Sequence, residues 1–352
     1  MLLSLIAAVL YLGLFWAAAG WIFGRVNLIG NGLTLFPFLI VSMEWIRSFG
    51  ALGFPWGNIV LSQLEFLPLI QIMEVTGSYG VTLWVSLLNV ILYILIQKFE
   101  PNKKLGLFIF IFLLGLWFSG KSRMKEFNQS NRVLEVGILQ PNIDPNTKWD
   151  FEMKTETIAY MDSLHGEAIL LNPDMIVFPE TAYPAYLRLN RTVRKMIQSK
   201  VDSSAIPVLT GTVDRTKSAT GDKQYFNSSM FFTPNHSYYL YNKLHLVPFA
   251  EYIPFSTQIP SLKNLNFGQG NFTHGTEYTV FEWDSTHFSN LICYESSIPK
   301  LVSKFVQNGA EMISIQTNDG WLGNSAGPYQ HYDIARIRAI ENRVPIVRSA
   351  NT

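Results

Sequence analysis

The only cysteine in this chain of 352 residues, Cys293, comes directly after an apolar run that is typical of a strand. Phe288–Ile292 forms that run, and Glu295 lies two positions beyond the cysteine. Enzymes built from alternating strands and helices often place a nucleophile at the carboxyl end of a strand. Free cysteine is also among the most buried residue types. Position alone therefore leaves Cys293 either a buried core residue or a nucleophile.

A thiol needs a nearby base or cation to become a good nucleophile at neutral pH. Histidine is the usual base, but no histidine here lies in a papain-like, caspase-like, HExxH or zinc-finger context. The histidines are His165, His236, His245, His274, His287 and His331. A single cysteine also argues against a structural zinc site, and the sequence implies no metal or other cofactor.

Two other strand-like runs end in residues that could replace the histidine. Met175–Phe178 is followed by a proline and then by Glu180, so the carboxylate should emerge at the rim of the sheet. Tyr238–Tyr241 leads to Lys243, and an apolar run after this lysine closes at Glu251.

Glu180, Lys243 and Cys293 could meet at one edge of a sheet. Glu180 would then take the thiol proton as a general base, with its pKa raised by an apolar setting. Lys243 would place positive charge against the thiolate and the later oxyanion, aided by a backbone N–H near Tyr294. Taken singly, a strand-end Glu or Lys is usually a solvated surface charge, so only the combination indicates a site.

The region from residue 126 to 352 shows alternating strand and helix patterns that predict a layered α/β domain. The expected strands are Val133–Leu139, Met175–Phe178, Pro207–Val213, Ser229–Phe232, Tyr238–Tyr241, Thr279–Trp283, Phe288–Cys293, Met312–Gln316 and Pro345–Arg348. The expected helices are Phe151–Leu171, Leu187–Lys200, Pro299–Asn308 and His331–Asn342. Hairpin-like runs between residues 207 and 243 predict that part of the sheet is antiparallel.

The first third of the chain differs from the rest in composition, because residues 1–120 contain only nine charged residues. Four uncharged apolar stretches occur there, and two of them reach the roughly 20 residues that cross a bilayer. The sequence therefore predicts a transmembrane domain of about four helices over residues 1–125. The stretches are Met1–Gly24, Leu33–Met43, Val75–Gln97 and Leu105–Gly120.

An interfacial loop is expected at residues 48–74, where a glycine-rich, aromatic segment includes Phe54–Gly57. This loop is either a wall or gate for a lipid chain or a simple interfacial turn. The lysines between Lys98 and Lys104 favour a cytoplasmic position for their loop, which puts the C-terminal domain on the other side of the membrane. The net charge of +1 is close to balanced, so the sequence does not show the excess of basic residues that is typical of nucleic-acid-binding proteins.

Together, the segments around Glu180, Lys243 and Cys293 resemble the carbon–nitrogen hydrolase (nitrilase) superfamily, whose α-β-β-α sandwich carries a Glu–Lys–Cys triad. With the membrane part added, the chain is similar to the bacterial apolipoprotein N-acyltransferase family. Further motifs fit that family in the same order. They are Phe54–Gly57, Gln140–Asn142, Trp149, Asn318–Gly323 and Gly327–His331.

This resemblance implies that Glu180 is the base, Lys243 the oxyanion-stabilising lysine and Cys293 the nucleophile. It also implies substrate-binding or supporting roles for Trp149, Glu251, Tyr294 and Glu295. The implied partners are a phospholipid acyl donor, a diacylglyceryl-modified lipoprotein acceptor and the membrane. The implied location is the bacterial inner membrane, crossed several times, with the catalytic domain on the periplasmic side.

Two departures from the family lead us to expect a fragment that lacks both ends. Family members usually have more membrane helices, one of them after the catalytic domain, and here the sequence stops just after a strand-like run. We therefore expect a nitrilase-like sandwich that is incomplete at its C-terminal end. Two other functions stay open: a membrane-tethered amidase that hydrolyses a small amide, and a non-catalytic membrane scaffold.

Overall fold

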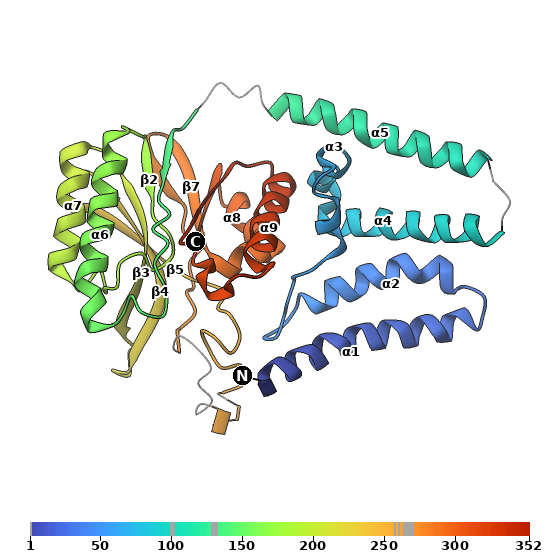
Figure 1. Ribbon diagram of the computed structural model, residues 1–352, viewed down its shortest axis with the longest axis horizontal. Coiled ribbons are helices and arrows are strands. Elements are labelled where there is room, and N and C mark those ends of the chain that lie inside the picture. The colour runs from blue at the N-terminus through green and yellow to red at the C-terminus, as the bar shows by residue number, and fades with distance from the viewer. Residues whose placement is uncertain (1, 99–102, 128–132, 257, 260, 263–270) are drawn as a thin grey trace. The chain divides into compact units, whose positions relative to one another are not determined.

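The computed structural model describes residues 2–98, 103–127, 133–256, 258–259, 261–262 and 271–352 (Figure 1). The chain divides into two compact units, residues 1–130 and residues 131–352. Each unit has its own architecture.

The first unit is helical. Its elements are α1 (Leu2–Asn27), α2 (Gly32–Arg47), the 3-10 helix η1 (Ile59–Gln63), α3 (Leu67–Ile70), α4 (Met73–Lys98, interrupted at Gly77) and α5 (Lys103–Phe127). Within residues 2–98 and 103–127, three segments are long and apolar enough to cross a membrane. They are Ile6–Asn27, Met73–Gln97 and Lys103–Phe127.

The prediction of about four spanning helices is therefore reduced to three in this part of the chain. The helix that falls short is α2, whose 16 residues extend about 24 Å, less than the roughly 30 Å of a hydrocarbon core. In contrast, α5 is longer than the apolar stretch that predicted it, because the helix continues through charged residues at both ends.

Two buried charged residues of α2 hold the loop that follows this helix. Arg47 donates to the carbonyl oxygen of Trp56 at 3.0 Å and to Oδ1 of Asn58 at 2.7 Å. The carboxylate of Glu44 accepts from the Ile59 backbone N–H at 2.7 Å and from the Thr82 hydroxyl at 2.8 Å. These bonds fold the glycine-rich segment back onto α2 and α4, so that the loop has a defined conformation.

The second unit contains a first sheet of five strands in the order β1-β2-β3-β4-β5. Its strands are β1 (Val136–Ile138), β2 (Met175–Val177), β3 (Val208–Lys217), β4 (Lys223–Thr233) and β5 (Ser237–Asn242). The pairs β1–β2 and β2–β3 are parallel, whereas β3–β4 and β4–β5 are antiparallel. The predicted antiparallel portion is thus confirmed.

A second sheet has four strands in the order β6-β7-β8-β9. They are β6 (Phe281–Trp283), β7 (Thr286–Ile292), β8 (Met312–Thr317) and β9 (Ile346–Ala350). The pair β6–β7 is antiparallel, and β7–β8 and β8–β9 are parallel. Strand β8 is buried along its whole length, as expected for a strand covered on both faces.

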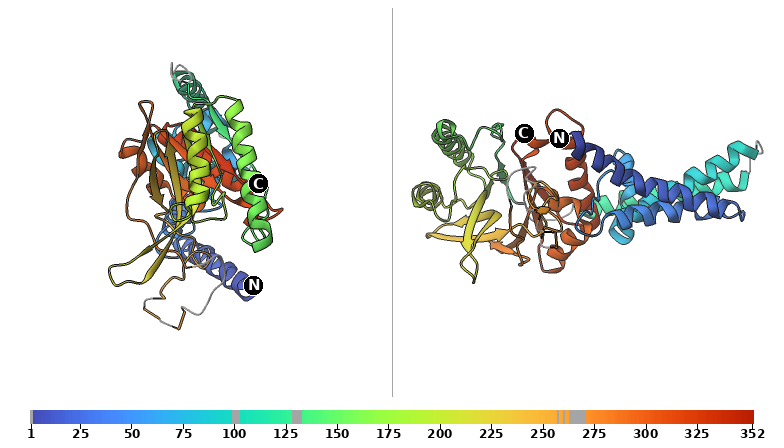
Figure 2. Two further views of the ribbon diagram at one scale, coloured as in Figure 1. Left: turned by 90° about the vertical axis from the view of Figure 1, so that its left-hand side faces the viewer. Right: turned by 90° about the horizontal axis from the view of Figure 1, so that it is seen from below.

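Helices cover the outer face of each sheet, which completes an α-β-β-α sandwich (Figure 1). Helices α6 (Phe151–Leu170) and α7 (Arg191–Ser204) lie side by side over the first sheet (Figure 2). Helices α8 (Pro299–Gln307) and α9 (Gly327–Asn342) cover the second. The predicted fold class is confirmed. Helix α7 begins later than predicted, because Asn190 caps it by accepting from the Val193 N–H.

Aromatic rings fill the space between the two sheets. Phe231 of β4 is fully buried, and its ring centroid lies 5.0 Å from that of Phe288 and 5.5 Å from that of Phe281. A polar bridge lies in the same layer, where Nε2 of Gln316 donates to the carbonyl oxygen of Phe178 at 2.6 Å. This bridge ties the second sheet to the segment that leads to Glu180.

Truncating the ring that joins the sheets should destabilise the sandwich. We expect Phe231→Ala to lower the free energy of unfolding by about 3–5 kcal/mol, because it leaves a cavity between two aromatic neighbours. Pulse proteolysis of the purified protein in urea measures this change. Phe151→Ala is the matched control, since Phe151 is 93% exposed, and equal stability of the two variants would contradict the assignment of Phe231 to the core.

Candidate active site

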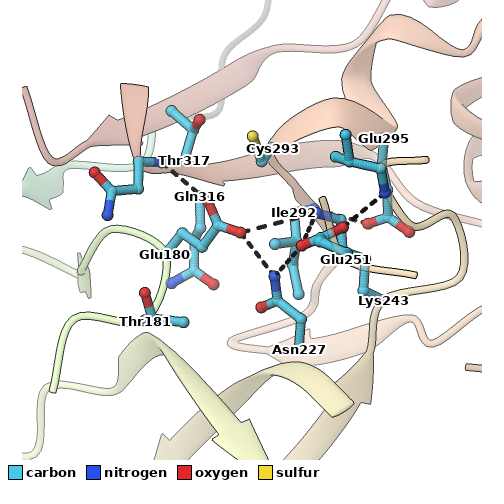
Figure 3. A network of polar contacts seen from close by, with 12 residues as sticks. Glu180, Thr181, Asn227, Lys243, Glu251, Ile292, Cys293, Glu295, Gln316 and Thr317 are labelled. Atoms are coloured by element: carbon cyan, nitrogen blue, oxygen red, sulfur yellow. Dashed lines mark hydrogen bonds and ion pairs between the residues drawn. The ribbon is translucent and has the colours of Figure 1, made fainter. Parts of the chain in front are cut away.

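The three predicted catalytic residues come together, but from two sheets rather than from one. Glu180 follows β2 and Lys243 follows β5, both in the first sheet, whereas Cys293 follows β7 in the second. The expectation that they meet at one edge of a single sheet was wrong. The strand ends converge because the sheets pack face to face, which places the nucleophile opposite the base and the lysine (Figure 3).

The segment that carries Glu180 is held close to β3. The Phe178 N–H donates to the Leu209 carbonyl oxygen at 2.9 Å, and the Ala182 N–H donates to that of Gly211 at 3.1 Å. A Cβ atom on Gly211 would lie 2.7 Å from the Cα of Glu180 and 2.4 Å from the Thr181 nitrogen. Only glycine allows this close approach, so Gly211 sets the position of the base.

The carboxylate of Glu180 is buried and accepts two well-placed hydrogen bonds. Its Oε1 accepts from Nδ2 of Asn227 at 2.8 Å, and its Oε2 accepts from the Asn318 backbone N–H at 3.0 Å. Burial raises the pKa of Glu180, and the ammonium of Lys243 opposes that rise. A carboxylate of raised pKa is well suited to accept a proton near neutral pH.

Lys243 is fully buried and forms its direct ion pair with Glu251 rather than with Glu180. Its Nζ lies 2.8 Å from Oε1 of Glu251 and 3.8 Å from Oε1 of Glu180. Asn227 bridges the two carboxylates, because its Nδ2 donates to both at 2.8 Å (Figure 3). Burial alone would lower the pKa of Lys243, but the charges of Glu251 and Glu180 outweigh it and raise the pKa. The lysine therefore stays charged.

Cys293 begins the 3-10 helix η3 (Cys293–Ser297) directly after β7 and adopts a left-handed backbone conformation with φ of 51°. Burial and the negative charge of Glu180 raise the pKa of its thiol, against the effects of Lys243 and of a hydrogen bond with Thr317. The thiol is thus protonated at rest. It becomes a nucleophile only when a base takes its proton, and Glu180 is the carboxylate whose charge reaches it most strongly.

Glu295 links two segments of the site through its buried carboxylate. Its carboxylate is fully buried and accepts from the Tyr241 hydroxyl at 2.8 Å and from the Ile292 N–H at 2.8 Å. It also accepts from the Leu244 N–H at 2.7 Å. Burial raises the pKa of Glu295 to about 7. One side chain therefore joins the end of β7 to the chain that follows Lys243.

The remaining predicted residues lie at the edges of this cluster. Tyr294 is 6% exposed, and its ring packs against His245. Trp149 is 39% exposed, whereas the residue before it, Lys148, is buried. Nζ of Lys148 donates to the carbonyl oxygen and the hydroxyl of Thr181 at 2.9 and 2.8 Å. The proposed pocket-lining roles of Trp149 and Tyr294 stay predictions.

Asn227 and Lys148 are site residues that the sequence did not reveal. Asn227 lies inside β4. In the sequence, nothing distinguishes it from the other polar residues of this strand. Burial lowers the pKa of Lys148 to about 8, opposed by the charge of Glu180. The sequence signal for Lys148 was its position beside Trp149, within a motif already noted.

Comparison with known proteins agrees with this geometry. The family model described as Carbon-nitrogen hydrolase matches residues 135–352, and the one described as Apolipoprotein N-acyltransferase N-terminal domain matches residues 1–91. An apolipoprotein N-acyltransferase from Geobacter metallireducens is 33% identical, over 97% of this chain and 67% of its own length. The chain belongs to the apolipoprotein N-acyltransferase family. The resemblance seen in the sequence is thereby confirmed.

A second relative and a solved structure are also similar to this chain. An apolipoprotein N-acyltransferase from Brucella melitensis is 32% identical, over 97% of this chain and 66% of its own length. The chain thus spans about two thirds of the length of these relatives of the apolipoprotein N-acyltransferase family. A solved carbon-nitrogen hydrolase from Helicobacter pylori matches 62% of this chain and 73% of its own, with 16% identity and a TM-score of 0.46.

The position of Lys148 predicts an effect on the pH profile of this enzyme. Glu180 faces Lys243, Glu251, Cys293 and Lys148, and the positive charge of Lys148 lowers the pKa of Glu180. Lys148→Met should therefore raise that pKa, so that the acid limb of kcat/KM for acyl transfer moves to higher pH. Lys148→Arg keeps the charge and should keep the limb in place. Identical limbs in both variants would show that the charge of Lys148 does not reach Glu180.

The contacts of Glu295 predict a loss of stability when its charge is removed. Glu295→Gln turns an acceptor into an amide whose NH₂ faces hydrogen-bond donors, which should cost about 1–3 kcal/mol. Pulse proteolysis measures the loss, and Glu277→Gln is the matched control because Glu277 is exposed. Wild-type stability of Glu295→Gln would show that its hydrogen bonds do not hold the two strand ends.

Proposed function

We propose that this protein N-acylates the terminal S-diacylglyceryl-cysteine of lipoproteins, with a phospholipid as acyl donor and a thioester on Cys293 as intermediate. The observation that carries the proposal is the convergence of the only cysteine with the buried side chains of Glu180, Lys243 and Glu251. Membership of the apolipoprotein N-acyltransferase family supports the choice of substrates.

In the first half-reaction, Glu180 takes the thiol proton of Cys293 as the sulfur attacks the ester carbonyl carbon of the phospholipid. The S–C bond forms and the C–O ester bond breaks, and Glu180 returns its proton to the departing lysophospholipid alcohol. Lys243 carries a permanent positive charge beside this centre. It stabilises the oxyanion of the tetrahedral intermediate.

In the second half-reaction, the α-amine of the acceptor attacks the thioester carbonyl. Glu180 takes one proton from the attacking nitrogen, the C–S bond breaks as the amide forms, and the proton passes to the sulfur of Cys293. Each half-reaction therefore leaves Glu180 ionised, and the second one also restores the thiol of Cys293. The proton is shuttled by one carboxylate, as its raised pKa permits.

The membrane unit explains why lipid substrates are favoured over a small soluble amide. Residues 2–98 and 103–127, which precede the sandwich in the sequence, contain three helices that are long and apolar enough to span a bilayer. A helix of that kind holds the protein where both an acyl donor and a lipid-modified acceptor are concentrated. Membership of the apolipoprotein N-acyltransferase family favours the inner membrane, and the lysines near residues 98–104 favour a periplasmic position for the catalytic unit.

Replacing the nucleophile tests the mechanism directly. We expect Cys293→Ala in the full-length protein to abolish both the thioester label from an alkyne-bearing phospholipid and the formation of N-acylated lipopeptide. Label lost on treatment with neutral hydroxylamine identifies the thioester. Ser203→Ala is the control, because Ser203 is exposed on α7. A hydroxylamine-sensitive label that persists in Cys293→Ala would end the proposal.

The same assay separates the alternative functions. An amidase would release ammonia from small amides faster than it acylates a lipopeptide, because water would resolve the thioester. A scaffold would show no Cys293-dependent label at all. Transfer to the lipopeptide at a rate above hydrolysis of the phospholipid is the result that supports an acyltransferase.

A further inference from the structure

Two motifs noted in the sequence, Asn318–Gly323 and Gly327–His331, have no part in the steps above. The structure brings one residue of each behind the nucleophile. Asp319 begins the 3-10 helix η4 (Asp319–Leu322), and His331 lies in the second turn of α9. Oδ1 of Asp319 lies 2.8 Å from Nδ1 of His331, and both side chains are 1% exposed.

Asp319 is held as an anion that fixes the orientation of this ring. Its Oδ1 accepts from the Thr317 hydroxyl at 2.8 Å, and its Oδ2 pairs with Arg348 of β9. Burial alone would raise the pKa of Asp319, but the contacts with His331 and Arg348 hold it below its usual value. Nδ1 of His331 carries a proton because Asp319 accepts there, and Nε2 carries one as well because the Cys293 carbonyl oxygen that it faces can only accept.

The other ring nitrogen meets the backbone of the nucleophile. Nε2 of His331 lies 3.1 Å from the carbonyl oxygen of Cys293 and 2.9 Å from the hydroxyl of Ser296. That hydroxyl also donates to the Cys293 carbonyl oxygen, at 2.9 Å. The ring and the hydroxyl thus hold one carbonyl group from two sides.

This carbonyl belongs to a residue in an unfavourable conformation. Cys293 has φ of 51°, and a residue other than glycine is strained in this region unless its surroundings hold it there. The direction of the thiol depends on this backbone angle. Contacts that fix the carbonyl group of Cys293 therefore also fix the direction of its sulfur atom.

We propose that His331, oriented by Asp319, is a positioning residue that grips the peptide carbonyl of Cys293 and keeps its thiol directed toward Glu180. The ring contacts the carbonyl oxygen and not the sulfur, so it does not replace Glu180 as the base. The inference rests on the proposed function only in taking Cys293 as the nucleophile.

Two substitutions of the same residue separate its two contacts. The amide nitrogen of His331→Gln can occupy the place of Nε2, so that this variant keeps the contact with Cys293 and gives up the one with Asp319. The amide of His331→Asn can occupy the place of Nδ1, so that it keeps Asp319 and gives up Cys293. His287→Gln and His287→Asn are matched controls, because the His287 side chain is 47% exposed.

The readout is the rate at which iodoacetamide alkylates Cys293 at neutral pH in the full chain, together with the rate of phospholipid labelling. Alkylation is specific because the chain has one cysteine. We expect His331→Asn to lose about 100-fold in labelling rate, as misplacement of a reacting atom by about 1 Å can do. We expect a slower alkylation as well, and we expect His331→Gln to retain most of both rates.

Equal rates in both His331 variants, whether normal or reduced, would overturn the proposal, and so would a defect confined to His331→Gln. If neither variant resists protease as the wild type does, Ser296→Ala decides. It removes one of the two groups that hold the carbonyl and leaves Asp319 and His331 in place, so it should slow labelling without changing KM, and unchanged labelling would refute the inference. Transfer that survives in Cys293→Ala would instead refute the proposed function.

Discussion

The burial of the Lys243 ammonium is the constraint on which the rest of the catalytic unit depends. A charge without exposure to water costs several kcal/mol unless partners compensate for it, and the Lys243 side chain is 0% exposed. Glu251 supplies the direct partner at 2.8 Å, and Glu180 a second charge at 3.8 Å. The two carboxylates repel each other, and the amide of Asn227 between them offsets that repulsion by donating to both.

This cluster forces several elements into fixed positions. Strand β4 has to bring Asn227 between two carboxylates that come from different loops, and the Val247 N–H has to reach Oε2 of Glu251 at 2.8 Å. If one partner were displaced, a buried charge would be left unpaired. As a result, burial raises the pKa of Glu180, and the charge of Lys243, whose own pKa is raised by the two carboxylates, limits that rise.

The nucleophile is held by a separate set of contacts on the second sheet. Glu295 ties the N–H of Ile292 to that of Leu244 and so joins the two sheets at the site. His331 and Ser296 hold the carbonyl of Cys293. The backbone of Cys293 is therefore held by groups of the second sheet and its helices, whereas Glu180 is held by the cluster around Lys243.

Much of the fold followed from the sequence, because the signals for it are local. Apolar runs bounded by glycine, proline and asparagine marked all nine strands of the described part of the sandwich, and a uniform shortage of charge marked the membrane helices. The error about α2 has a physical cause. Apolar composition does not show where a helix ends, and Arg47 turns inward to bind the next loop.

The sequence by itself determined which groups could do the chemistry: one cysteine, with Glu180 and Lys243 each just beyond a strand. Only the tertiary structure decided how they are used. It placed them on two facing sheets, paired Lys243 with Glu251, and brought in Asn227, Lys148 and His331, whose contacts no local pattern predicts. Local sequence patterns show where a strand ends. The pairing of buried charges depends on which side chains come into contact, and these contacts form only when the two sheets pack together.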